Sequence, residues 1–197
     1  MLNCVYKLKL KKLKITNTNF SVLVSVLILV FTLFSCTNPK PRKPVMRAGQ
    51  IDMTKSIAFN KKLFELETKA FKTIIKRDTL HEYFESKRGF WYAYDVKIEK
   101  DSITPKKGDE VIFSYDISAI NGELIYAASE LGDKTYLVDL QDFMQGIQEG
   151  IKMMKVKEKM IFLLPSQKAY GVYGDENKIG TNTPLIVRVA LKEITNK

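Results

Sequence analysis

The chain begins with a basic stretch that is followed by an apolar one. Five lysines stand among the first fourteen residues, and residues 20–34 are apolar apart from two serines and one threonine. A helix of this length reaches about 22 Å, which is short of the roughly 30 Å hydrocarbon core of a bilayer. A basic region and a short apolar stretch that ends in a small residue are typical of a secretory signal peptide.

Residues 33–36, Leu-Phe-Ser-Cys, close this stretch and resemble a bacterial lipobox, where a signal peptidase cuts before the cysteine and the sulfur receives a diacylglycerol. The resemblance implies a signal peptide over 1–35 and lipidation of Cys36, which would anchor the chain in a membrane. An uncleaved signal anchor is the alternative, although the polar run at 16–19 prevents the apolar stretch from extending backwards. Cleavage would also remove Cys4 and leave no free thiol, which suits an oxidising envelope compartment.

Residues 36–53 contain Pro39, Pro41 and Pro44 among several basic residues. Alternating prolines favour an extended and solvated tether without a packed core. The tether lacks the acidic cluster that is associated with some surface-exported lipoproteins. We therefore expect a lipid-anchored protein of the cell envelope that faces the periplasm from the outer or the inner membrane.

The next segment, 54–88, begins with a strongly amphipathic helix over 54–77, for which Thr54 is the expected cap. Its apolar side chains spread over one half of the helix, and lysines dominate the other half. An apolar face this wide is unfavourable in water, so we expect it to pack either on the following domain or on a second copy, as a homodimer. His81 has no companion ligand or nucleophile nearby in the sequence and is expected at the surface.

From Gly89 onward the apolar positions alternate with period two, which predicts strands. Asn121-Gly122 predicts a tight hairpin, and the apolar spacing over 144–151 predicts one short helix. The predicted class is therefore α+β, with an antiparallel sheet of five to six strands that wraps on the short helix and is preceded by the amphipathic helix. The strand-like runs are 90–98, 111–118, 123–128, 136–140, 160–164 and 185–192.

Composition excludes several kinds of chemistry. Two cysteines and one histidine cannot form a disulfide framework, a thiolate zinc site or a histidine-rich site, so we expect neither a metal nor another cofactor. The formal net charge is +10, but the five lysines of the leader account for half of it. The remainder is only mildly basic, so no nucleic-acid partner is expected.

Five motifs follow one another in the second half of the chain. They are 108–115, the G-x-x-E-G helix at 144–154, Leu164-Pro165, Ala169-Tyr170-Gly171 and 179–185. The same motifs occur in this order in FKBP-type peptidyl-prolyl isomerases, and the chain over 89–197 resembles that family's domain, over about 105 of the 197 residues. The basic leader, the lipobox, the helix and the opening at 89–92 are further similar to the gliding-motility-associated FKBP lipoproteins of Bacteroidota.

The resemblance implies an apolar cup for a proline ring. Tyr115, Tyr126 and Tyr170 would be its catalytic residues, and Tyr170 would offer its hydroxyl to the substrate backbone. The backbone N–H of Met144 would hold a substrate carbonyl. For each aromatic residue, plain packing in the core is the alternative. The substrate-binding residues that the resemblance implies are Tyr136, Phe143, Met144, Ile147, Ile179 and Val187.

Rotation about an X–Pro bond in such a cup requires few functional groups. An X–Pro bond rotates over a barrier of about 20 kcal/mol, and uncatalysed exchange takes tens of seconds or longer. Catalysis needs a dry apolar cup and donors that suit the twisted carbonyl, without a nucleophile, a metal or a proton transfer. A chain with 11 phenylalanines and 9 tyrosines is compatible with this chemistry.

Four positions depart from the family pattern. Ala127 stands where the family has an acid that interacts with the pocket tyrosine, and Gly180 stands in place of a loop proline. Ile147 and Val187 are smaller than the expected tryptophan and phenylalanine. We therefore expect a deeper and looser cup, weaker catalysis than in an average member and poor binding of macrolide drugs.

Two functions follow as hypotheses. The first is an anchored isomerase that acts on X–Pro bonds of exported envelope polypeptides and supports the folding of gliding-motility components. The second is a low-activity binding module, chaperone or assembly subunit of the cell envelope, which Ala127 favours.

Overall fold

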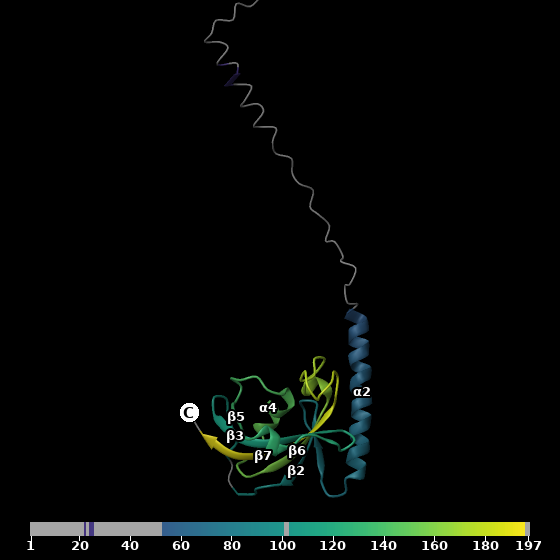
Figure 1. Ribbon diagram of the computed structural model, residues 1–197, viewed down its shortest axis with the longest axis vertical. Coiled ribbons are helices and arrows are strands. Elements are labelled where there is room, and N and C mark those ends of the chain that lie inside the picture. Colours follow the sequence, from purple (N-terminus) through teal and green to yellow (C-terminus); the bar gives the residue numbers. More distant parts are fainter. Residues whose placement is uncertain (1–21, 23, 26–52, 101–102, 196–197) are drawn as a thin grey trace, which may run out of the picture. The chain divides into compact units, whose positions relative to one another are not determined.

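The computed structural model describes residues 22, 24, 25, 53–100 and 103–195 (Figure 1). The chain divides into two units, 1–50 and 51–197. In the first unit, the three described residues are helical and exposed, and the proposed lipidation site Cys36 lies outside the described residues. No helix within the described ranges is long and apolar enough to span a bilayer.

The predicted amphipathic helix is present as α2, Met53–Arg77. Lys76 and Arg77 stand in its last turn, where cations interact favourably with the helix dipole. The fully buried Phe71 lies at the centre of its packed face, 5.5 Å between ring centroids from Trp91. This face covers a second, smaller apolar cluster to which Ile161, Leu163 and Ile186 of the sheet contribute. The expectation that α2 packs on the following domain is therefore confirmed.

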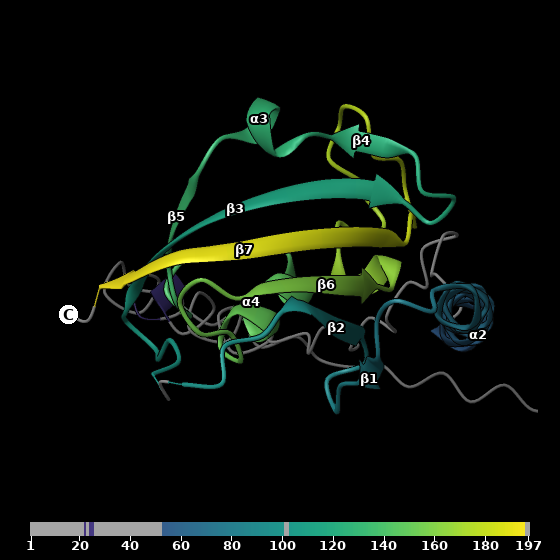
Figure 2. The same cartoon turned by 90° about the horizontal axis from the view of Figure 1, so that it is seen from below.

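Seven strands of the described residues form one antiparallel sheet in the order β1-β2-β6-β7-β3-β4, with β5 also paired to β3 (Figure 2). The α+β class is confirmed, and the sheet has one strand more than predicted. The additional strand is β1, which lies in the segment expected to be helical and pairs with β2. The strands are β1 (Tyr83–Glu85), β2 (Trp91–Val96), β3 (Glu110–Ala119), β4 (Leu124–Tyr126), β5 (Lys134–Leu137), β6 (Lys159–Leu164) and β7 (Leu185–Thr195).

Strand β3 organises the sheet. It pairs with β7 along its whole length, and its other edge pairs first with β5 and then with β4. Because side chains alternate between the two faces of a strand, every second residue of β3 from Val111 to Ile117 enters the main core. The short helix α4 (Gln145–Ile151) packs on this core, and a second short helix, α3 (Ala128–Leu131), connects β4 to β5.

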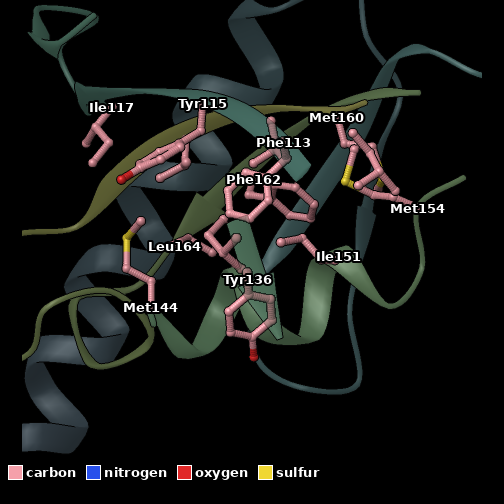
Figure 3. Close-up of a cluster of buried hydrophobic side chains, with 14 of the residues drawn as sticks. Phe113, Tyr115, Ile117, Tyr136, Met144, Ile151, Met154, Met160, Phe162 and Leu164 are labelled. Atoms are coloured by element: carbon pink, nitrogen blue, oxygen red, sulfur yellow. The ribbon is translucent and has the colours of Figure 1, made fainter. Parts of the chain in front are cut away.

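Two glycines allow α4 to lie close to β6. A Cβ at Gly146 would stand 2.4 Å from a methyl carbon of Leu164, and one at Gly150 would stand 2.5 Å from the ring of Phe162. Real side chains do not reach such distances, so larger residues here would push the helix off the sheet. The two glycines of the G-x-x-E-G motif thus have a packing role. Figure 3 shows the buried side chains between helix and sheet, with Phe162 and Phe113 at the centre.

Candidate functional site

Three tyrosines from separate parts of the chain gather at one end of the main core. Tyr115 is on β3, Tyr126 ends β4, and Tyr170 follows the short 3-10 helix Ser166–Lys168. Burial, with smaller contributions from the neighbouring Tyr115, Asp175 and Tyr126, raises the pKa of Tyr170 to about 12. Tyr115 and Tyr126 belong to the main buried cluster and Tyr170 packs against it, so the structure brings together the three tyrosines that the sequence singled out.

Asp175 organises the rim of this site and was not identified from the sequence. One of its carboxylate oxygens accepts a hydrogen bond of 2.5 Å from the Tyr126 hydroxyl. The other accepts the backbone N–H groups of Ile179 at 2.7 Å and Asn177 at 3.0 Å. Burial alone would raise the pKa of Asp175, but these donors outweigh it and lower the pKa. Tyr126 is thereby fixed to the loop that follows Tyr170.

Lys178 adds a second connection between that loop and β4. Its ammonium lies 4.5 Å from the centre of the Tyr126 ring and 2.6 Å from a carboxylate oxygen of Glu130. A cation over an aromatic face is attracted by the ring. Asp175 therefore holds the hydroxyl of Tyr126, and Lys178 contacts one face of its ring.

The hydroxyl of Tyr115 is bonded differently from that of Tyr126. No described residue forms a hydrogen bond with it, and burial raises its pKa. Its ring meets Phe143 edge-on, with centroids 5.4 Å apart and planes at 87°. Ala127, which stands where the family resemblance implies an acid, has no side-chain group that could accept this hydroxyl.

Tyr136 occupies the inner side of Phe143. It is fully buried, and its hydroxyl accepts the backbone N–H of Asp139 at 3.2 Å. The two ring centroids are 6.3 Å apart. In this conformation Tyr136 supports Phe143 and offers no surface to a ligand.

The floor of the proposed cup is covered. Ile147 and Val187 have an exposed fraction of zero, although both are smaller than the residues expected there. Neither side chain is therefore exposed at the bottom of an open cavity in this conformation, and the deeper and looser cup expected from their size stays a prediction. Met144 and Ile179 are almost fully buried beside them, and Figure 3 shows the Met144 side chain extending toward the Tyr115 end of the cluster.

The backbone of Met144 is arranged as the start of α4. Its carbonyl accepts the N–H groups of Ile147 at 2.9 Å and Gln148 at 3.0 Å. Its own N–H has no acceptor among the described residues, so it remains available to a carbonyl of a bound peptide. Among the residues that the structure describes, no group of three histidine, cysteine or acidic residues is placed to hold a metal ion.

Comparison with known proteins gives consistent results. Residues 101–192 match the family model of the FKBP-type peptidyl-prolyl cis-trans isomerase. Peptidyl-prolyl cis-trans isomerase FKBP9 of Homo sapiens is 30% identical over 95 residues, which are 47% of this chain and 16% of that protein. The probable FKBP-type isomerase FkpA of Neisseria meningitidis is 28% identical over 101 residues, which are 51% of this chain and 37% of that protein. The chain thus spans well under half of the length of these curated relatives.

Two solved structures show the same fold. FkpA from Escherichia coli superposes with a TM-score of 0.55 and 18% identity, covering 92% of this chain and 74% of that one. A peptidyl-prolyl cis-trans isomerase from Pseudomonas syringae pv. tomato also has a TM-score of 0.55, with 17% identity, and the match covers 69% of this chain and 96% of that one.

Proposed function

Because its residues 101–192 match the family model of the FKBP-type peptidyl-prolyl cis-trans isomerases, we propose that the protein accelerates rotation about X–Pro bonds. The observation that supports this most directly is the meeting of Tyr115, Tyr126 and Tyr170 at one end of an apolar core. The proline ring would bind beside Met144 and Phe143, above Ile147 and Val187, which belong to the same apolar cluster. Such an environment excludes water from the bond, and water is what stabilises its planar form.

The polar groups at the rim would orient the peptide. The hydroxyl of Tyr170, held protonated by burial, would donate to the substrate backbone. The N–H of Met144, which has no acceptor among the described residues, would hold a second carbonyl. Tyr115 would place its unbonded hydroxyl near the twisted carbonyl. No proton is transferred, so the contribution of these groups is placement and the exclusion of water.

A binding module with little turnover is the second candidate. The covered floor at Ile147 and Val187 favours it, because each binding event must first displace packed side chains. One measurement distinguishes the two candidates. The cis–trans exchange of an X–Pro peptide, followed without a coupling protease, is accelerated by an isomerase and stays at the uncatalysed rate with a module that only binds.

The substrates and the location belong to the same proposal. The lipobox-like residues 33–36 and the basic leader support an anchor at Cys36 in the cell envelope, and hence exported, proline-containing polypeptides as clients. Incorporation of labelled palmitate that is lost in Cys36→Ser tests the anchor. A role in gliding motility rests on the resemblance of the leader, the helix and the opening at 89–92. Unimpaired gliding of a deletion strain would count against it.

A homodimer through the helix is supported by apolar side chains on α2 that the sheet does not cover. Ile57, Phe59 and Leu66 are each more than half exposed. Pairing with a second copy would bury them. Sedimentation of the purified chain beside a Phe59→Glu variant tests this: a dimer that the variant dissociates supports the pairing, and a monomeric parent contradicts it.

A further inference from the structure

Glu67 stands on the packed face of α2, where a charged side chain is unusual. Its exposed fraction is 4%. One carboxylate oxygen, Oε2, accepts a hydrogen bond of 3.1 Å from the backbone N–H of Ser166, and Oε1 has no partner among the described residues. Burial raises the pKa of this carboxyl, because the charged form loses its solvation. A buried carboxylate with an unsatisfied oxygen lowers stability, so helix packing alone does not explain it.

Ser166 begins the turn that contains Tyr170. It is 1% exposed, and its carbonyl accepts two hydrogen bonds, from the N–H of Ala169 at 3.1 Å and from the N–H of Gly171 at 2.8 Å. Tyr170 is the residue between these two donors. A displacement of Ser166 therefore moves both chain neighbours of Tyr170 together.

We infer that Glu67 is a positioning residue, which fixes Ser166 and, through the turn at 166–171, the ring of Tyr170 at the cup. The inference rests on the proposed isomerase function. It also makes α2 part of the site, although α2 lies before residues 101–192, to which the family model applies. Glu67 and Ser166 are 99 positions apart in the sequence.

A merely structural role for Glu67 would be to hold α2 on the sheet. Apolar contact already does so, because Phe71 packs against Trp91 within the smaller cluster. The two roles can be separated, since a change at Phe71 weakens the packing and leaves the hydrogen bond to Ser166 in place. Thr68 offers a second control, because its hydroxyl is buried and forms no hydrogen bond with any described residue, those of the turn included.

The test uses the full chain, purified in detergent, with four variants. Glu67→Met keeps the volume and removes the acceptor, whereas Glu67→Gln keeps an oxygen that can accept the Ser166 N–H. Phe71→Leu and Thr68→Val are the controls. Two quantities are measured at a temperature where all variants are folded: kcat and KM for exchange of an X–Pro peptide, and hydrogen exchange of the amides at 169–171.

Glu67→Met is expected to lower kcat roughly tenfold with little change in KM, since small misplacements of catalytic groups cost up to two orders of magnitude. Amide exchange at 169–171 should accelerate in the same variant. Glu67→Gln should recover most of both losses, and Phe71→Leu should lower the melting temperature without either effect.

The inference is overturned if Glu67→Met keeps both the kcat of the parent chain and its amide hydrogen exchange at 169–171. It is also overturned if Phe71→Leu lowers kcat as strongly as Glu67→Met does when the two variants have lost the same stability. If the parent chain does not isomerise at all, the proposed function fails. The exchange of the three amides then still decides whether Glu67 orders the turn.

Discussion

The hydroxyl of Tyr126 donates a hydrogen bond of 2.5 Å to Asp175, a residue 49 positions further along the chain. The same carboxylate accepts the N–H groups of Asn177 and Ile179, so one side chain holds both the Tyr126 hydroxyl and the loop at 175–179. The rim of the site is thus built around an acid of the loop, while the position directly after Tyr126 is an alanine.

Replacing Asp175 with alanine is expected to reduce isomerisation and to lower the free energy of unfolding by about 1 to 2 kcal/mol, because three donors lose their acceptor together. Catalysed exchange and urea unfolding of the variant give the two values. Asp133→Ala is the matched control, since Asp133 is half exposed and, among the described residues, pairs with Lys192 alone. Equal effects of the two substitutions would remove Asp175 from the site.

Replacing Ala127 with aspartate is expected to raise both activity and stability. Ala127 is the N-cap of α3, and no side chain caps this helix end. An aspartate there would accept a helix N–H, which contributes about 1 kcal/mol, and would return an acid to the neighbourhood of the tyrosines. An unchanged exchange rate in a stabilised variant would show that position 127 does not limit catalysis.

Replacing Gly150 with alanine is expected to destabilise the protein by about 1 to 3 kcal/mol, because the added methyl overlaps the Phe162 ring. Thermal and urea unfolding measure the change. Gly180→Ala is the control, since a Cβ there meets only an ordinary contact at 3.7 Å. Similar losses in both variants would contradict the close approach of α4 to β6.

The rate of catalysed exchange should stay level from about pH 7 to about pH 10. Burial raises the pKa of Tyr170 to about 12 and also raises that of Tyr115, so both hydroxyls stay protonated across this range. Deprotonation removes the donors only above it, where the preference of the fold for neutral tyrosine also lowers stability. Circular dichroism at each pH controls for unfolding. A fall in rate with a midpoint near pH 8, in a folded chain, would assign the donor to another group.

The periodicity of apolar residues predicted most helices and strands, because each of these elements is set by residues that are close in sequence. Apolar spacing was sufficient for α2 and α4, and alternation was sufficient for β3 and β7. The three-residue β1 was missed because a strand this short, with one partly buried and two exposed residues, has no periodic signal.

The site was predicted less completely, and the missing residues have one feature in common. Asp175 and Glu67 act through partners 49 and 99 positions away, and neither has a local signal of its role. Glu67 occupies what the sequence presents as an ordinary charged position of an amphipathic helix. The full burial of Ile147 was likewise not predictable from residue size, because it depends on how side chains from separate parts of the chain pack in three dimensions.

The most direct measurement is the exchange rate of a leucine-proline peptide, followed by NMR without protease, with the parent chain, Tyr170→Ala and Tyr173→Ala. Tyr173 lies in the same loop and is 85% exposed, so it matches Tyr170 in residue type and local sequence. The account predicts acceleration by the parent and by Tyr173→Ala, and a loss of roughly tenfold or more in Tyr170→Ala. No acceleration by a folded parent chain, or equal rates in all three proteins, would contradict it.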